Sequence, residues 1–313
     1  MTKKSHDDDA VFGPVPSRRL GLSLGVDLLT HKVCSLDCVY CECGPTTRLT
    51  TERGRFRDLA DVLSQVERRL AELERPPDYV TLAGSGEPCL SLDLGTAIAR
   101  LKAMGPHKVA VLTNATLVGD AAVRAELALA DLLVPSLDAV SPAAFRRVNR
   151  PAAGLDPQAI IEGLALLRRE MAGQMWLEIL LAGGYNDSPE ELALLLAAVA
   201  RINPHKVQLG TVVRPPALAG VKPVAPEVLG RLAGALTTPV EVIPPPRGAA
   251  GLDKGDLGSR LVEMTRRRPC TVADAAAAAG LAEERARELL DGLVGAGLAT
   301  VSRYDGRAYY RGV

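Results

Sequence analysis

Residues 34–41 read Cys34-Ser35-Leu36-Asp37-Cys38-Val39-Tyr40-Cys41, which places three cysteines at C-x3-C-x2-C spacing. A loop this short can turn all three thiolates toward one metal centre. An iron–sulfur cluster is usually held by four cysteines, so a four-iron cluster bound here would keep one iron open to another ligand. The alternative is a structural zinc loop with Cys43 as fourth ligand, but structural zinc usually takes two separated pairs of ligands. The spacing therefore favours an iron–sulfur cluster.

The composition is typical of a globular protein with a sizeable core. The chain has 313 residues, of which 47% are hydrophobic and only 3% aromatic, so aliphatic side chains must fill the interior. Lys+Arg and Asp+Glu number 37 each, so no overall charge favours nucleic acid or an anionic membrane. No apolar run reaches the roughly 18 residues of a membrane span, and residues 1–9 are too polar for a signal peptide. We therefore expect a cytoplasmic location and no membrane partner.

Strand-like and helix-like segments alternate along most of the chain. Residues 12–19 are broken by Pro and Gly and are expected to form a loop, and a first strand is predicted at 25–29. Apolar residues at helical spacing predict a helix over 56–73. Further strands are predicted at 79–83, 108–112, 132–134, 175–181, 206–213 and 240–243, and helices at 94–104, 120–130, 155–171 and 226–236, with another opening at Ser188. Such alternation indicates parallel strands joined by right-handed crossovers, and hence an α/β fold with a partial (β/α)6 barrel.

Polar side chains follow directly after several of these predicted strands. In folds of parallel strands, sites lie at the carboxyl ends of the strands. Any one of these residues could be ordinary loop polarity, but together they indicate a site. They are Glu87, Thr113, Asn114, Ser136, Asp138 and Arg214.

Residues 244–251 form a Pro- and Gly-rich break in composition. The expected organisation is a disordered N-terminus at 1–10, a barrel domain at 11–247, a linker at 248–254 and a second domain at 255–313. The second domain shows helices at about 258–267, 272–279 and 282–296, then a hairpin around Tyr304-Asp305-Gly306. Helix, helix, helix and hairpin is the order of a winged helix.

The charge of this second domain is nearly balanced. From Asp253 to the end it carries ten Lys/Arg and nine Asp/Glu, whereas a winged helix that grips duplex phosphates normally shows a basic face. Docking of a protein or other substrate and binding of RNA are equally open interpretations, and gene regulation comes third.

Several motifs together resemble the radical S-adenosylmethionine (SAM) superfamily. Tyr40 fills the aromatic position before the third cysteine, and Gly84-Ser85-Gly86-Glu87-Pro88 is similar to the family's Gly-Gly-Glu-Pro motif. Residues 15–21, residues 135–139 with Asn149-Arg150-Pro151, and residues 208–216 resemble the branch that contains the tRNA wyosine-base synthase. The resemblance covers about residues 11–247.

The chain departs from the wyosine enzyme in three respects. That enzyme carries a second cluster on cysteines upstream of the SAM loop, and no cysteine precedes Cys34 here. It also uses a lysine to hold pyruvate; Lys32 lies beside the loop, but an exposed loop lysine is the simpler interpretation. It has no winged-helix tail. The same reaction is therefore not implied, and Cys43, Cys89 and Cys270 are left as packing residues or as ligands of a second metal centre.

The resemblance implies the cofactors and the reaction type. Cys34, Cys38 and Cys41 would bind a 4Fe-4S cluster, and the amino and carboxylate groups of SAM would chelate its open iron. An electron from a donor such as a flavodoxin or ferredoxin would cleave SAM to methionine and a 5′-deoxyadenosyl radical. That radical would abstract hydrogen from an unidentified substrate, which could be RNA, peptide or a small molecule. The protein's part is to position the reactive carbon and exclude side reactions.

The resemblance also implies SAM-binding roles for the strand-end residues. The SAM ammonium would meet the carbonyls of Gly84 and Gly86 and the region of Glu87, because glycine lets backbone approach a ligand closely. Ser136 or Arg150 would hold the SAM carboxylate. The ribose hydroxyls would meet Asn114, Asp138 or Glu178, and Tyr40 would lie near adenine.

Some of these roles have plainer alternatives. Arg150 could be a surface cation after a helix, Glu178 could face solvent, and Tyr40 could simply pack under the loop. Arg18, Arg19 and Arg214 could line a substrate mouth that favours anions, although arginine is abundant in this chain.

Two other classes of function compete with a radical SAM enzyme. One is a metal- or SAM-sensing regulator that binds DNA through the winged helix. The other is a zinc-stabilised structural protein, which would be colourless and hold stoichiometric zinc. The nearly neutral tail and the set of strand-end polar residues favour the enzyme.

Overall fold

A computed structural model describes residues 10–17, 19–30, 32–243 and 257–313 of the chain. Most of the predicted disordered N-terminus, the predicted linker at 248–254, Arg18 and His31 lie outside the described residues. Ala10, which was expected to be disordered, is buried and donates its backbone N–H to Gln65 Oε1 at 2.9 Å. The boundary between the two expected domains falls among residues 244–256 and stays a prediction.

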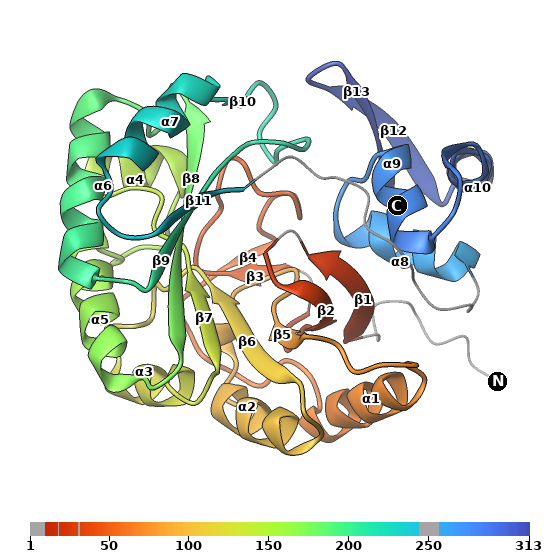
Figure 1. Cartoon of the computed structure of the whole chain (residues 1–313), viewed down its shortest axis with the longest axis horizontal. Helices are drawn as coiled ribbons and strands as arrows, with labels where there is room; N and C mark the ends of the chain where they lie inside the picture. Colours follow the sequence, from red (N-terminus) through yellow and green to blue (C-terminus); the bar gives the residue numbers. More distant parts are fainter. Residues whose placement is uncertain (1–9, 18, 31, 244–256) are drawn as a thin grey trace.

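A curved, mostly parallel sheet forms the centre of the larger part of the molecule (Figure 1). In the described residues its order is β1-β2-β5-β6-β7-β8-β9-β11, with β1 antiparallel to β2 and every later pair along this path parallel. The strands are β1 (Val11–Ser17), β2 (Gly21–Val26), β5 (Tyr79–Leu82), β6 (Lys108–Thr113), β7 (Leu132–Pro135), β8 (Gln174–Gly183), β9 (Lys206–Thr211) and β11 (Val240–Val242), and β10 (Lys222–Pro223) pairs with β8. The predicted α/β fold of parallel strands is confirmed.

Helices cover the outer face of this sheet (Figure 1). Buried Leu, Ile, Val and Ala side chains from strands and helices fill the space between the two layers. One helix begins as predicted from capping chemistry: Ser188 accepts the backbone N–H of Glu191, and Pro189 occupies the first turn. The helices are α1 (Leu59–Ala71), α2 (Leu94–Ala103), α3 (Ala121–Leu127), α4 (Pro142–Val148), α5 (Pro157–Glu170), α6 (Pro189–Ile202) and α7 (Pro226–Ala235), with a 3-10 turn at Pro88–Leu90.

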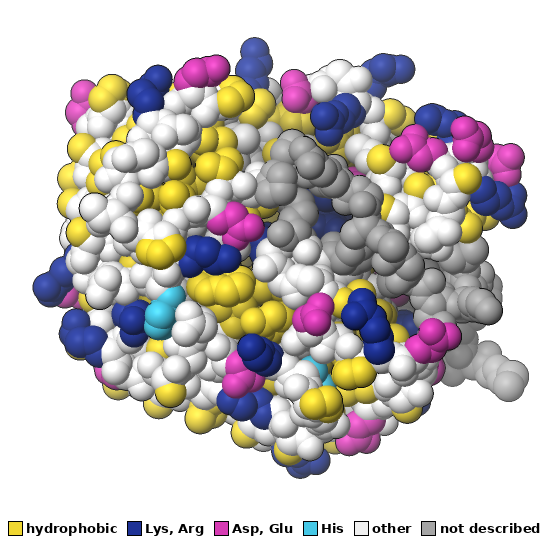
Figure 2. All heavy atoms as spheres, in the orientation of Figure 1, with side chains coloured by type: hydrophobic (Ala, Val, Ile, Leu, Met, Phe, Trp, Pro, Cys, Tyr) yellow, Lys and Arg dark blue, Asp and Glu magenta, His cyan; other side chains and the backbone are white. Residues whose placement is uncertain are grey.

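The inner face of the sheet has its own apolar cluster. Side chains from the turn before β2 and from strands β5 to β8 meet there, so these strands are buried on both faces, as is usual for parallel sheets. Figure 2 shows hydrophobic side chains gathered where β6 and β7 lie in Figure 1, with charged side chains around them. The members of the cluster are Leu20, Tyr79, Ala110, Leu112, Leu132, Val134 and Trp176.

The first strands differ from the prediction. The segment expected to be a loop at 12–19 is largely β1, and the first parallel strand begins at Gly21 rather than at residue 25. Pro and Gly lower strand propensity, but an edge strand tolerates proline, and here a register shift between Phe12 and Val15 accommodates Gly13 and Pro14. Sequence pattern alone gives no sign of which strand lies at the edge.

The C-terminal part contains three helices and a hairpin, in the predicted order. They are α8 (Leu257–Arg267), α9 (Val272–Ala279), α10 (Glu283–Gly295), β12 (Ala299–Tyr304) and β13 (Arg307–Gly312). These elements enclose a small core that includes Leu261, Ala275, Leu290 and Tyr310. The module lies beside β1 and β2 (Figure 1). Its assignment as a winged helix stays a prediction.

No described helix is both long and apolar enough to cross a membrane.

Candidate active site

The three-cysteine loop runs between the short strands β3 (Val33–Cys34) and β4 (Arg48–Leu49), which pair in parallel. Backbone hydrogen bonds tie this loop to the segment after α4. Asp37 N–H donates to Asn149 O at 3.0 Å, and Ala152 N–H donates to Ser35 O at 2.9 Å. The stretch Asn149-Arg150-Pro151, which contributed to the resemblance, therefore serves to hold the loop in place.

Each of the three cysteine sulfurs accepts a hydrogen bond from a side-chain nitrogen that comes from a different segment. The donors come from just before β3, from the turn after β6 and from the end of α4. The pairs are Lys32 Nζ to Cys41 Sγ at 3.1 Å, Asn114 Nδ2 to Cys34 Sγ at 3.5 Å and Asn149 Nδ2 to Cys38 Sγ at 3.3 Å. Donors of this kind stabilise negative charge on sulfur.

The thiols themselves differ in acidity. Burial raises the pKa of Cys34 to about 12, and burial likewise raises the pKa of Cys38 well above its ordinary value. A hydrogen bond from Cys43 lowers the pKa of Cys41 to about 6, against the opposing effect of burial and with help from the nearby charge of Lys32. Cys41 is thus the cysteine of the loop that most readily becomes a thiolate.

The donor set is compatible with an iron–sulfur cluster. In the described part of the chain, no three His, Cys, Asp or Glu side chains converge on one point that would hold a metal ion. The cysteines of an iron–sulfur cluster bind separate irons and need not converge on one point. Three sulfurs on one short loop, each with its own N–H donor, meet the requirements of a cluster with one open iron.

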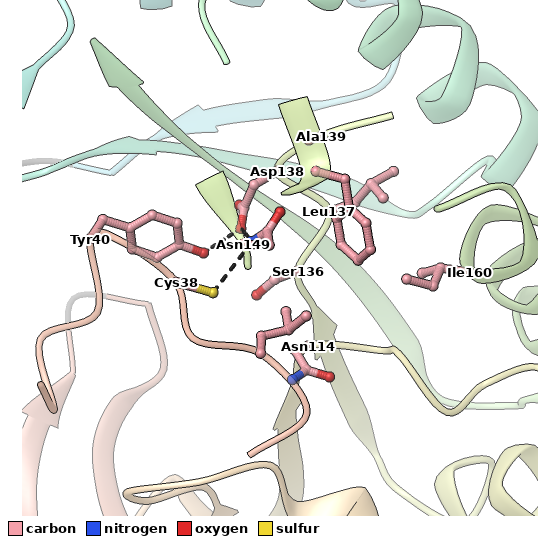
Figure 3. A pocket seen from close by; sticks show the side chains of 11 residues that line it. Cys38, Tyr40, Asn114, Ser136, Leu137, Asp138, Ala139, Asn149 and Ile160 are labelled. Carbon is pink, nitrogen blue, oxygen red and sulfur yellow. Dashed lines mark hydrogen bonds between the residues drawn. The ribbon is translucent and has the colours of Figure 1, made fainter. Parts of the chain in front are cut away.

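A pocket opens beside Cys38 at the carboxyl ends of β6 and β7 (Figure 3). Figure 3 shows Tyr40, Asp138, Asn149 and Cys38 meeting on one side of it. The cysteine loop, the turns after the two strands, α4 and α5 all contribute to its walls. The lining residues are Leu36, Cys38, Tyr40, Asn114, Ser136, Leu137, Asp138, Ala139, Phe145, Asn149 and Ile160.

Asp138 connects the parts of this wall. Its carboxylate accepts the Tyr40 hydroxyl, Asn149 Nδ2 at 2.9 Å and the backbone N–H of Leu180 at 2.9 Å. Asp138 is buried, and burial raises its pKa to about 6 despite these donors. A ribose hydroxyl at this carboxylate would therefore share oxygens that already have protein partners.

Glu87 faces the protein interior behind the pocket. Oε1 accepts the Thr113 hydroxyl at 2.6 Å and the Cys89 N–H at 2.9 Å, while Oε2 accepts the Asn114 N–H at 2.6 Å. Burial raises its pKa above the ordinary value, although these donors act in the opposite direction. The carboxylate thus positions Asn114, which lines the pocket.

The two glycines of the same motif are required by close packing. A Cβ on Gly84 would lie 2.1 Å from the carboxyl carbon of Asp27, and a Cβ on Gly86 would lie 2.0 Å from Val33 O. Asp27 in turn accepts the backbone N–H and the hydroxyl of Ser85, both at 2.9 Å. The motif therefore packs tightly against β3 and the end of β2.

The remaining predicted residues lie in different places. Ser136 lines the pocket. Glu178 forms an ion pair with Arg19 on the inner side of the barrel, with 20% of its side chain exposed. Arg150 has a positive φ of 46°, is half-exposed and lies 3.7 Å from Asp37. The structure thus brings Cys38, Tyr40, Asn114, Ser136 and Asp138 to one pocket, and leaves Arg150 and Glu178 outside its lining.

Two residues of the site were missed or misjudged from sequence. Lys32 is only 3% exposed, so the expectation of an exposed loop lysine is wrong. Asn149 was noticed only as part of a motif, yet it contacts both Cys38 and Asp138. Lysine is scarce in this chain and Lys32 lies two residues before Cys34, which is the signal that could have identified it.

The other cysteines are separated from one another. Cys89 is buried with Sγ 3.3 Å from Thr113 Oγ1, Cys270 is buried in the core of the C-terminal module, and Cys43 Sγ lies 3.7 Å from Gly84 O. Arg214 is also buried, between Glu42 and Asp274. Arg214 therefore does not line a substrate mouth, because its guanidinium is used inside the protein.

The fold and site together define an α/β enzyme with a three-cysteine site at the carboxyl ends of parallel strands. A family model described as the radical SAM superfamily matches residues 28–196, and the chain belongs to this superfamily. Enzymes of this class use a 4Fe-4S cluster and SAM.

Curated relatives match the same region. The chain is 37% identical over 213 residues to the GTPase Obg of Brachyspira hyodysenteriae, which covers 68% of this chain but only 31% of that protein. It is 38% identical over 223 residues to a UPF0026 protein of Synechocystis sp., covering 71% of this chain and 80% of that one.

Solved structures share the fold at low identity. The structure of TYW1 with a lysine-pyruvate adduct bound has a TM-score of 0.52 and 18% identity, over 74% of this chain and 76% of that chain. A radical SAM methyltransferase from Sphaerobacter thermophilus has a TM-score of 0.53 and 21% identity, over 70% of this chain and 65% of that chain. The likeness to both is a likeness of fold.

Proposed function

We propose that this protein cleaves SAM reductively at a 4Fe-4S cluster on Cys34, Cys38 and Cys41, and that the resulting 5′-deoxyadenosyl radical abstracts hydrogen from a substrate. The observation that carries this proposal is the pocket, lined by both polar and apolar side chains, that opens directly beside Cys38. A cofactor bound to an open iron needs such a space next to the cysteines. The bound cluster and SAM would supply the electron transfer and the radical.

The protein's own residues would hold and orient these groups. Asn149 and Asp37 keep the loop against the segment after α4. Asn114 and Ser136 offer an amide and a hydroxyl to the pocket (Figure 3). Tyr40, which belongs to the loop and is fixed by its hydrogen bond to Asp138, contributes to the pocket wall. Prepositioned polar groups of this kind lower the cost of bringing reactants together.

The C-terminal module supports the enzyme over a DNA-binding regulator. In its hairpin, the Tyr309 hydroxyl donates to Val213 O at 2.7 Å and the Tyr304 hydroxyl donates to Val221 O at 3.1 Å, so one face of the hairpin is docked on the barrel. Helix α10 exposes more acidic than basic side chains: Glu283, Glu284, Glu288 and Asp291 against Arg285 and Arg287. An acidic helix face repels phosphates. The electron would come from a separate donor such as a flavodoxin or ferredoxin.

The first prediction tests the cleavage of SAM. Wild-type protein reconstituted anaerobically with iron and sulfide, then given dithionite and SAM, is expected to release 5′-deoxyadenosine, measured by chromatography. Cys38→Ala should lose cluster absorbance and product, because one of the three ligands is missing. Cys270→Ala is the matched control and should keep both, since Cys270 lies in the other core.

Two results would contradict the proposal. One is iron-loaded wild type that forms no 5′-deoxyadenosine. The other is a colourless protein that binds zinc and loses it in Cys43→Ser, which would favour the structural zinc site.

A further inference from the structure

Lys32 is a buried cation beside the cysteine loop. Its backbone is fixed from both sides by Thr47, whose hydroxyl accepts the Lys32 N–H at 2.8 Å and whose N–H donates to Lys32 O at 3.1 Å. Its side chain reaches Cys41 Sγ at 3.1 Å and Gly44 O at 2.5 Å. The ammonium group is thus held at one corner of the site by backbone and side-chain contacts.

The charge of this ammonium needs a counter-charge. A buried cation is costly unless an anion lies close by. No carboxylate forms an ion pair with Lys32 in the described residues; its side chain meets a sulfur and a carbonyl oxygen. The negative charge that balances Lys32 is therefore the cysteine site itself.

The donors to the three sulfurs are unequal. Cys34 and Cys38 accept from the neutral amides of Asn114 and Asn149, whereas Cys41 accepts from a cation. Hydrogen bonds from charged donors are shorter and stronger than those from neutral ones. Hydrogen bonds to the sulfurs and net charge are among the factors that set the reduction potential of an iron–sulfur cluster.

We infer that Lys32 raises the reduction potential of the cluster by placing its ammonium on Cys41 Sγ. Reduction adds one negative charge to the cluster, and a cation in direct contact with a ligand sulfur stabilises the reduced form more than the oxidised form. Lys32 thus acts through Cys41 to adjust the reduction potential of the cluster, and a higher potential makes it easier for the cluster to accept the electron. The inference rests on one part of the proposed function, the binding of the cluster by the three cysteines, and does not depend on the cleavage of SAM.

The second prediction tests this inference on the reconstituted holoprotein without SAM. Lys32→Met removes the charge while keeping an unbranched side chain, and is expected to shift the potential to more negative values in a redox titration followed by electron paramagnetic resonance. Lys32→Arg should stay near wild type because it keeps a cationic donor. Lys102→Met is a control, since Lys102 pairs with Asp131 at the surface. A Lys32→Met potential equal to wild type would overturn the inference.

A second measurement uses only the wild-type protein, so it remains possible even if the Lys32 variants fail to bind a cluster. Wild-type holoprotein labelled with nitrogen-15 at the lysine ζ position should show a nitrogen-15 coupling to the reduced cluster, because Lys32 Nζ lies 3.1 Å from Cys41 Sγ. The absence of this coupling would overturn the inference. Wild type that takes up no iron would instead overturn the proposed function, so the two failures are distinguishable.

Discussion

Glu87 connects the Gly-rich motif after β5 to the turn after β6. One buried carboxylate satisfies a hydroxyl and two backbone N–H groups, from Thr113, Cys89 and Asn114. The motif was expected to serve SAM directly, and the structure adds that this side chain organises the protein around the pocket. Removing an acceptor from buried donors costs their desolvation as well as the hydrogen bond.

The third prediction concerns this residue. Glu87→Gln replaces one acceptor oxygen by an NH₂ group that faces N–H donors, so the free energy of unfolding of the metal-free protein should fall by about 2 kcal/mol in a urea titration. Glu67→Gln, on the exposed side of α1, is the control and should be unchanged. Equal midpoints for Glu87→Gln and wild type would show that the carboxylate is dispensable.

At the scale of elements, the cysteine loop depends on contacts between strands that are distant in sequence. The turn after β5 is pressed against β3, with Glu87 N–H donating to Val33 O at 3.1 Å. Gly86 permits this approach because it has no Cβ. The residue after Val33 is Cys34, so the turn lies next to the first of the three proposed cluster ligands.

The fourth prediction follows from this contact. Gly86→Ala would place a Cβ 2.0 Å from Val33 O, which is backbone and cannot rotate away. The iron content after reconstitution should fall well below that of wild type, because β3 and Cys34 must shift. Gly119→Ala is the matched control, since no atom outside its immediate neighbours lies within 4 Å of the added Cβ. Normal iron content in Gly86→Ala would contradict the expected shift.

At the scale of the whole molecule, the C-terminal module contacts the residue that follows the cysteine loop and helps to hold it in place. Arg214, after β9, lies 3.1 Å from Glu42 and 3.7 Å from Asp274 of α9, and its side chain is 1% exposed. Arg311 of β13 donates to Glu42 O at 2.7 Å. Glu42 directly follows Cys41, so contacts from the module reach the residue next to a proposed cluster ligand.

The fifth prediction tests how much the ion pairs of Arg214 contribute to stability. Arg214→Met removes the guanidinium that pairs with Glu42 and Asp274. It should lower the free energy of unfolding by about 3 kcal/mol, the low end for a broken buried ion pair because Glu42 is 32% exposed. Urea unfolding is the measurement. Arg201→Met, which breaks a surface pair with Glu162, should have little effect. If both variants unfold like wild type, the interface contributes little to stability.

Local patterns were enough to predict much of this molecule. Hydrophobic periodicity indicated helices, and the cap at Ser188 with Pro189 begins α6 as expected. Cysteine spacing and polar residues after the strands pointed to the site, and five of the predicted residues line one pocket. Each of these signals is contained within a short stretch of neighbouring residues, so the sequence carries it directly.

Local sequence patterns alone predict the strand–helix alternation, the three-cysteine loop and the edge of the sheet at which the site lies. Which side chains meet the sulfurs was settled by long-range packing in the folded chain: Asn149 reaches Cys38 from 111 residues away and Asn114 reaches Cys34 from 80. The same packing also decided that Lys32 and Arg214 are buried. Contacts between distant residues depend on how the elements pack, and packing leaves no spacing or period in the chain that could be recognised beforehand.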